Sequence, residues 1–376
     1  MNGRWMCTLS SLALLLALAA PLRAADTVKI GVAGPMTGPV AKFGEQLARG
    51  AKAAVDAINA AGGINGAMLE LVVEDDACDP KQAQSVANSL VNAQVAAVIG
   101  HFCSASTIPA SAVYAENDIL DITPASTNPV VTDRHLATVF RTCGRDDQQG
   151  AVAADYIATK LKPKRIAVIH DKSTYGQGLA DATKARLNDH YKIQEALYEG
   201  INQGDKDFNS LITKMKGMEI DAIFFGGYHT EAGLIVRQAY DQGLKAKFIS
   251  GDALATEEFG DVVGKPEAAA GTLMTFGADP TKYPQARAIV EKFKQEGYNP
   301  EGYTLYTYAA VQVAAAALKA NGNSHDGKKL ADWLRSHPVD TVMGMKSYDA
   351  KGDLKVSDYV VYGWVRAGDK VTYKQL

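Results

Sequence analysis

The feature that most constrains the fold is a regular alternation of short apolar runs with longer segments of helical pattern. In the first part of the chain we expect strands at 28–32, 69–73, 95–99 and 119–122, and helices at 44–60, 80–92 and 109–116. Strands that alternate with helices in this way form βαβ units, and the strands of such units lie parallel in one sheet.

A second series of the same kind begins after Arg145. Here the expected strands are 165–169, 221–225 and 247–250, and the expected helices are 178–188 and a segment ending at 237–241. These runs are apolar throughout, which favours parallel sheets covered by helices on both faces. The C-terminal third is helix-rich at 283–320 and 328–336 and ends in a strand-like run at 359–366. We therefore expect an α/β protein with two doubly wound parallel-sheet lobes.

The N-terminus has the three-part pattern of a secretory signal peptide, which we assign to residues 1–25. Arg4 provides the positive charge, 9–20 is the apolar run, and small residues follow Pro21. The run is shorter than the roughly 20 apolar residues that span a bilayer. Cys7 precedes the run, whereas a lipid-bearing cysteine would follow it. We therefore expect an exported protein that is cleaved at this end and is soluble.

The charge of the mature chain argues against two classes of partner. Removal of Arg4 and Arg23 with the leader leaves a net charge of about −5, which does not favour nucleic acid or an anionic membrane surface.

Three cysteines remain after cleavage. In an oxidising compartment two of them are expected to form a disulfide, and we expect the pair Cys78–Cys103 with Cys143 left free. A metal site that combines these two cysteines with His101 is the alternative. No second cysteine or histidine motif supports it, so we expect no metal.

Polar residues gather in the segments that directly follow the expected strands. Ligands of open α/β sheets bind beyond the carboxyl ends of the strands. The segments there are 100–107, 123–127, 170–176, 226–229 and 251–253. They contain hydroxyl groups, two tyrosines and the acid Asp252, a set that suits a zwitterion because hydroxyls and free N–H groups hold a carboxylate and an acid holds an ammonium.

Each of these residues also has a simpler interpretation. Ser104 is equally expected as a helix N-cap. Tyr175 and Tyr228 are equally expected as core or surface aromatics, and Asp171 beside Lys172 is expected to be a solvated pair.

Enzymatic motifs are absent from the sequence. There is no GxSxG elbow, HExxH pair, phosphate-binding loop or dinucleotide-binding glycine motif. The acids at 74–76 and Asp79 look like a cluster that could bind calcium. Consecutive acids on a strand or turn point in different directions, however, so we do not expect a calcium site there. We therefore expect neither an enzyme nor a cofactor.

Five motifs together resemble a known family. The motifs are DDACDPKQA at 75–83, IGHFCS at 99–104, HDKSTYG at 170–176, GGYH at 226–229 and DTVMG at 340–344. They resemble the leucine/isoleucine/valine-binding proteins of bacterial ABC importers, and the similarity runs in order from Asp26 to about Trp364.

The resemblance implies a type I periplasmic binding fold with two lobes joined by a three-segment hinge. It places the crossings near Arg145, Phe276 and Tyr359. The lobes would then be 26–145 plus 276–358, and 146–275 plus 359–376. The resemblance also implies the Cys78–Cys103 disulfide.

The resemblance implies, in addition, how each lobe contacts a ligand. Ser104, Ala125 and Thr127 would hold the carboxylate and ammonium of an amino acid from the first lobe. The second lobe would close on the ligand with Tyr175, Tyr228 and Asp252, and the side-chain pocket would be lined by Phe43, Phe102 and Tyr303.

The function that follows is the capture of a small aliphatic amino acid, such as a branched-chain one, for a membrane-embedded ABC permease. We expect a periplasmic monomer. A ligand-sensing protein of the same fold, feeding a receptor or regulator, is the alternative.

The sequence departs from the family pattern at two places. Asp252 stands where the family carries glutamate, and the residues at 253–256 differ from the usual glycine-containing stretch. Cys143 stands where the family does not normally have cysteine. The shorter acid is expected to shift the preference toward smaller or more polar amino acids.

Overall fold

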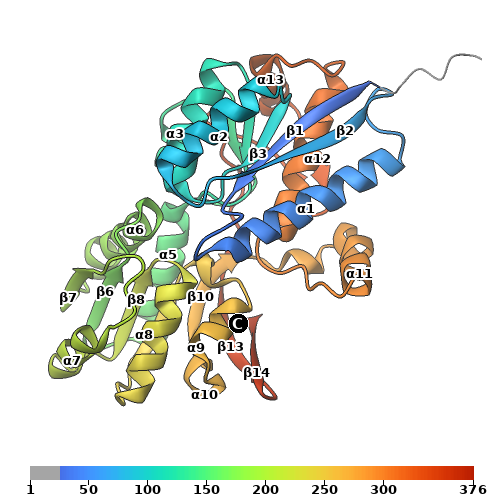
Figure 1. The fold of residues 1–376 in the computed structure, drawn as a ribbon. Helices are drawn as coiled ribbons and strands as arrows, with labels where there is room; N and C mark the ends of the chain where they lie inside the picture. The colour runs from blue at the N-terminus through green and yellow to red at the C-terminus, as the bar shows by residue number, and fades with distance from the viewer. Residues whose placement is uncertain (1–25) are drawn as a thin grey trace, which may run out of the picture.

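The computed structural model describes residues 26–376, which form two large sheets with helices on their faces and one small two-stranded sheet (Figure 1). The expected signal peptide at 1–25 lies outside the described residues. No helix within residues 26–376 combines the length and the apolar character that crossing a membrane requires.

The first sheet has five parallel strands in the order β2-β1-β3-β4-β5. The strands are β1 (Thr27–Gly34), β2 (Met68–Asp75), β3 (Ala97–Gly100), β4 (Leu120–Thr123) and β5 (Val139–Arg141). The helices that connect them are α1 (Ala41–Ala60), α2 (Pro80–Asn92), α3 (Ser104–Glu116) and the short α4 (Val130–Asp133).

Elements from the last third of the chain also pack on this first sheet. These elements are α12 (Thr304–Ala320), α13 (Gly327–Ser336) and the two-stranded pair β11 (Val339–Thr341) and β12 (Gly344–Lys346). In Figure 1, α12 lies beside α1, and α11 (Arg287–Gln295) stands at the edge of the molecule.

The second sheet has seven strands in the order β14-β13-β10-β9-β8-β6-β7. The strands are β6 (Ile166–His170), β7 (Leu197–Gly200), β8 (Ala222–Gly226), β9 (Lys247–Ser250), β10 (Leu273–Gly277), β13 (Tyr359–Ala367) and β14 (Lys370–Gln375). The helices around it are α5 (Asp146–Tyr156), α6 (Thr174–Tyr191), α7 (Asn209–Gly217), α8 (His229–Asp241), α9 (Glu258–Val263) and α10 (Pro266–Ala269).

Both sheets repeat one strand order. Taken in chain order, β6 to β10 are arranged 2-1-3-4-5, as are β1 to β5. The second sheet then adds β13 and β14, which run antiparallel because a tight turn joins them. The expected doubly wound arrangement is confirmed for five strands of each sheet, and the antiparallel pair is an addition that the alternation did not predict.

Burial explains why the strand pattern was readable. Every residue of β3, β4, β6 and β8 is buried, which is the environment of a strand covered on both faces.

The start of α2 follows local chemistry, whereas the start of α3 does not. At α2, the Asp79 side chain accepts hydrogen bonds from the backbone N–H groups of Lys81 and Gln82, and Pro80 occupies the first helical position. At α3, the expected start at Pro109 was wrong, because the helix begins at Ser104 and holds Pro109 inside it.

Candidate ligand-binding cleft

The loops that follow the strands of both sheets meet around a small cavity with a volume of about 10 Å³. Its lining residues are Phe102, Ser104, Ala125, Tyr175, Tyr228, Asp252 and Ala253. The loops after β1 and β3 lie where the strand order of the first sheet reverses, and those after β6 and β8 lie at the equivalent place in the second. Open α/β sheets bind their ligands at such switch points.

Ser104 faces the cavity from the first sheet. It is the first residue of α3, and the N-cap position belongs to Cys103, which makes no side-chain capping bond. The Ser104 hydroxyl instead accepts a 3.4 Å hydrogen bond from the backbone N–H of Asn128. The capping interpretation of Ser104 was therefore wrong, and its hydroxyl lies at the cavity wall.

Ala125 and Thr127 follow β4 on the same side. Ala125 lines the cavity, and Thr127 is fully buried. The Thr127 hydroxyl has no hydrogen-bond partner within residues 26–376.

A buried arginine supports the loop that carries these two residues. Arg141, at the end of β5, donates to the backbone oxygens of Ser126 at 2.8 Å and Asn128 at 3.3 Å. Asp353 lies 2.7 Å from the Arg141 Nε and balances its charge. The nearby guanidinium groups of Arg141 and Arg145 lower the pKa of Asp353, although burial opposes them. Removing either partner of a buried ion pair leaves an uncompensated charge, so this pair fixes the shape of the 125–128 loop.

Asp252 projects into the cavity from the second sheet, directly after β9. One carboxylate oxygen accepts hydrogen bonds from the Tyr175 hydroxyl at 2.7 Å and from the Gln149 amide at 3.0 Å. The other accepts from the Tyr303 hydroxyl. Burial raises the pKa of Asp252, and these three hydrogen bonds partly offset that rise.

Gly251 allows the close approach of Asp252 and Tyr175. A Cβ atom at Gly251 would lie 2.5 Å from the Tyr175 hydroxyl and 2.4 Å from a methyl group of Leu179. Only glycine fits between the end of β9 and the start of α6.

Tyr303 reaches Asp252 from the opposite side of the cavity. It precedes α12, and its backbone N–H donates to the buried Gln46 side chain of α1 at 2.9 Å. Gly302 adopts a positive φ of 50°, and a Cβ atom there would lie 2.4 Å from the Gln46 oxygen. The position of Tyr303 is thus set by α1 and by one glycine.

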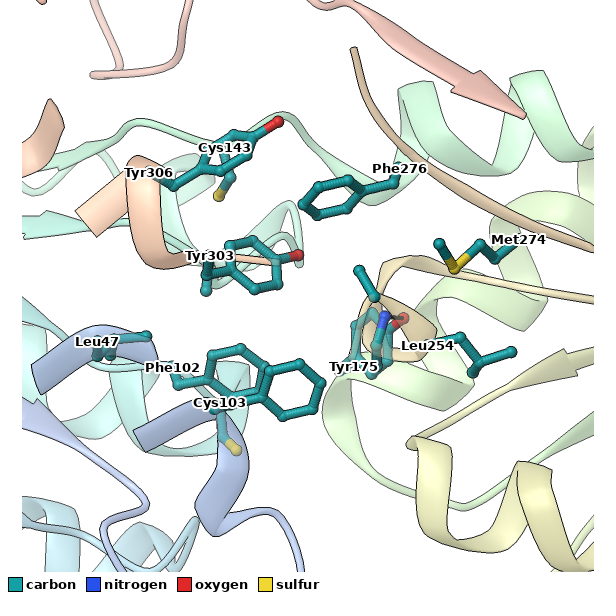
Figure 2. Close-up of a cluster of buried hydrophobic side chains, with 14 of the residues drawn as sticks. Leu47, Phe102, Cys103, Cys143, Tyr175, Leu254, Met274, Phe276, Tyr303 and Tyr306 are labelled. Carbon is teal, nitrogen blue, oxygen red and sulfur yellow. Dashed lines mark hydrogen bonds between the residues drawn. The ribbon is translucent and has the colours of Figure 1, made fainter. Parts of the chain in front are cut away.

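Aromatic rings fill the space beside the cavity (Figure 2). The rings of Phe43 and Phe102 stack with their centroids 4.3 Å apart. The Tyr303 ring lies between Phe102 and Phe276, edge-on to both at 5.4 Å. Tyr175 and Tyr228 are buried and lie 5.3 Å apart, so both belong to the cavity wall rather than to the surface.

Two polar residues of this region were missed by the sequence analysis. Gln149 and Asp146 lie on one face of the first turn of α5, and Gln149 bonds Asp252. Asp146 is fully buried, and neither of its oxygens has a hydrogen bond of normal geometry within the described chain. Burial and the Asp252 charge raise the pKa of Asp146 well above its usual range, while the nearby Thr127 and Arg141 lower it less. In the sequence, the run of acids after Arg145 was the only feature that pointed to Asp146 and Gln149.

Asp171 was also wrongly interpreted. It is buried, and it accepts hydrogen bonds from the backbone N–H of Ser173 at 2.9 Å and from its hydroxyl at 2.6 Å. Burial raises the pKa of Asp171 to about 6. It supports the start of α6, and thus Tyr175, instead of pairing with Lys172 in solvent.

Cys78 and Cys103 form the expected disulfide, with their Cα atoms 5.5 Å apart. Cys143 is a buried free thiol whose pKa burial raises to about 12.

His101 contacts Asp76 and Tyr114 through its two ring nitrogens, at 2.5 and 3.0 Å. Across residues 26–376 there is no group of three or more potential ligands arranged to hold a metal ion.

Comparison with known proteins decides the family. The sequence model of the periplasmic binding protein family matches residues 27–369, nearly the whole described chain. The chain belongs to the periplasmic binding protein family. The resemblance found in the motifs is therefore confirmed, and the family is one of solute-binding proteins.

Two proteins that are similar to this periplasmic binding protein are named as amino-acid-binding proteins. An amino acid binding protein of Pseudomonas aeruginosa is 59% identical over 353 residues, covering 94% of this chain and 93% of that protein. A Leu/Ile/Val-binding protein homologue of Brucella suis is 51% identical over 350 residues, covering 93% of each.

A solved structure shares the fold. The leucine-binding protein of Thermotoga maritima superposes with a TM-score of 0.83 at 28% identity, covering 92% of this chain and 97% of that one. The expected type I fold, with two lobes joined by three segments, is thereby confirmed.

Proposed function

We propose that this periplasmic binding protein captures an amino acid with a small aliphatic side chain and delivers it to a membrane-embedded ABC permease. The observation that carries the proposal is the buried Asp252 carboxylate, which faces a small cavity whose opposite wall holds the Ser104 hydroxyl. An acid on one wall and a hydroxyl donor on the other match the two charged ends of a zwitterion. The amino-acid names of the relatives support the same ligand class.

The contacts divide between the two sides of the cavity. Ser104, Ala125 and Thr127 hold the carboxylate and ammonium from the first lobe, where Ser104 and Ala125 line the cavity. Asp252 accepts from the ammonium, with Tyr175 and Tyr228 closing over the ligand. The side-chain pocket is formed by Phe43, Phe102 and Tyr303, whose rings pack against one another beside the cavity.

The lobes are residues 26–145 plus 276–358 and residues 146–275 plus 359–376. Membership of the strands in the two sheets supports this division. The crossings then lie near Arg145, Phe276 and Tyr359, and the hinge closes because the ligand bonds both lobes at once. The protein works as a periplasmic monomer after cleavage of a signal peptide at 1–25.

A ligand screen on the mature protein tests the proposal. Thermal-shift measurements with each amino acid are expected to show stabilisation by leucine, isoleucine, valine or a smaller aliphatic amino acid, because a ligand that binds only the folded state stabilises it. 4-Methylpentanoate, which is leucine without its ammonium, is the matched control and is expected to give no shift. Stabilisation by no amino acid at all would contradict the proposed ligand class.

Small-angle scattering tests the hinge with the ligand found in that screen. We expect a more compact particle in the presence of ligand. Identical open profiles with and without saturating ligand would contradict closure.

A further inference from the structure

A groove separate from the ligand cleft lies where two of the proposed crossings run side by side. It is lined by Thr142 and Gly144, which follow β5, and by Ser357 and Asp358, which lead into β13. Its remaining walls come from β12, from the segment at 354–356, from α12, from Met343 and from Tyr283, whose hydroxyl donates to Asp358 at 3.4 Å. The groove has a volume of about 170 Å³ and shares no lining residue with the cleft.

The lysine at the end of β12 is unusual in this groove. Lys346 lines it and is only 8% exposed. Its ammonium makes neither a hydrogen bond nor an ion pair with any residue of the described chain. The negative charge of Asp358 acts on Lys346 and raises its pKa slightly, but the two side chains are too far apart to form an ion pair. Burial accordingly lowers the pKa of Lys346.

The side chain of Lys346 is largely buried, and its ammonium reaches solvent at the groove without a partner from the described chain. A cation that is partly removed from water and lacks a counter-charge favours an anion placed beside it. An anionic group placed in the groove would supply the missing partner at Lys346 and form a charge-assisted hydrogen bond.

The other walls of the groove indicate what is attached to that anion. The Tyr306 hydroxyl has no hydrogen-bond partner in residues 26–376, so it adds a donor near the lysine. Met345 and Val356 are large apolar residues that are 62% and 75% exposed, and Met343 lies beside them. A lysine and a phenol hydroxyl next to exposed apolar side chains match a carboxylate that carries an aliphatic tail.

We propose that this groove is a second binding site, which takes a small organic carboxylate with its head group at Lys346 and its aliphatic tail over Met345 and Val356. The site is independent of every role assigned to the cleft.

Methionine-methyl NMR with hexanoate as the probe tests the site. In protein labelled at the methionine methyl groups, hexanoate is expected to shift the signals of Met343 and Met345 saturably. The signal of Met215, buried in α7, is expected to stay unchanged. Hexanamide, a neutral molecule of the same shape, is expected to shift them at least about tenfold more weakly, because it cannot form the charged hydrogen bond.

Two variants complete the test. Lys346→Gln removes the charge and keeps most of the length, so hexanoate binding is expected to fall at least about tenfold. Lys355→Gln removes an exposed charge on the adjoining segment and is expected to leave binding unchanged. Absence of saturable shifts at Met343 and Met345, or equal binding by Lys346→Gln and the parent protein, would overturn the proposal. Shifts that Asp252→Asn abolishes would place hexanoate in the cleft and overturn it as well.

Discussion

The Tyr303 hydroxyl donates a hydrogen bond to the Asp252 carboxylate and so joins the two sides of the ligand cleft. Tyr303 is held by α1 and α12 on the first sheet, whereas Asp252 follows β9 of the second. The bond occupies the carboxylate oxygen opposite Tyr175 and Gln149, which is where we place the ligand ammonium. A ligand therefore competes with an internal donor of the protein.

Replacement of Tyr303 by phenylalanine tests this competition. Tyr303→Phe keeps the ring between Phe102 and Phe276 but removes the donor. The ammonium then no longer has to displace a hydrogen bond to a charged group, so we expect affinity to rise by up to roughly tenfold. Calorimetry with the amino acid found by the screen measures it. Weaker binding would instead show that the hydroxyl contacts the ligand directly.

Loss of the acid is expected to have a larger effect of the opposite sign. Asp252→Ala leaves the ligand ammonium without a partner in a closed cleft, so binding is expected to weaken by at least about 2 kcal/mol, or about thirtyfold. Asp261→Ala, which removes an exposed acid of α9, is the matched control. Equal affinity of Asp252→Ala and the parent protein by calorimetry would remove Asp252 from the site.

The thiols provide a prediction about the fold. Within residues 26–376 Cys143 is the one free cysteine, so titration of the unreduced, denatured mature protein is expected to find one thiol. In the native protein, burial and a pKa of about 12 should keep Cys143 unreactive. Reduction of Cys78–Cys103 is expected to lower the free energy of unfolding by about 3–4 kcal/mol, measured by urea denaturation. Three thiols, or a mixed disulfide of Cys143, would contradict the pairing.

Asp171 gives a pH dependence with a definite sign. Its folded pKa of about 6 exceeds the value of about 3.9 expected in the unfolded chain, so between these values the folded state binds more protons. Its contribution to stability is fully present below about pH 4 and is lost as pH rises through about 6.

Asp171→Asn removes this titration. Between about pH 4 and about pH 7 the parent protein is expected to lose roughly 2–3 kcal/mol relative to the variant, measured by urea unfolding at each pH. Asp189→Asn, at an exposed position near the end of α6, is expected to track the parent protein. A constant difference between the parent and Asp171→Asn across this range would show that Asp171 does not titrate there.

Local pattern in the sequence was sufficient for much of the fold. The short apolar runs that became β3 and β8 are covered on both faces, so nearly every residue had to be apolar and the pattern was plain. The start of α2 was readable because Asp79 and Pro80 supply a cap and a first helical position within neighbouring residues. The family motifs lie at the strand ends for a related reason, since the residues that meet a ligand follow the strands directly.

Features that depend on contacts between segments far apart in the chain could not be predicted from local sequence patterns. β5 has three residues and ends in Arg141. The charge of this buried arginine is balanced by Asp353, which comes from the C-terminal region. The strand expected at 359–366 is confirmed as β13, but its antiparallel pairing with β10 and β14 depended on where the returning chain could pair.

The amino-acid sequence by itself determined the alternation of strands and helices, the family, and which loops face the cleft, because each of these depends on residues close together in the chain. Only the tertiary structure decided that Tyr303 bonds Asp252, that Asp146 and Gln149 join the same buried cluster, and that Lys346 lines a second groove. These relationships depend on burial and on distances between segments far apart in the chain, and such quantities exist only once the lobes have packed.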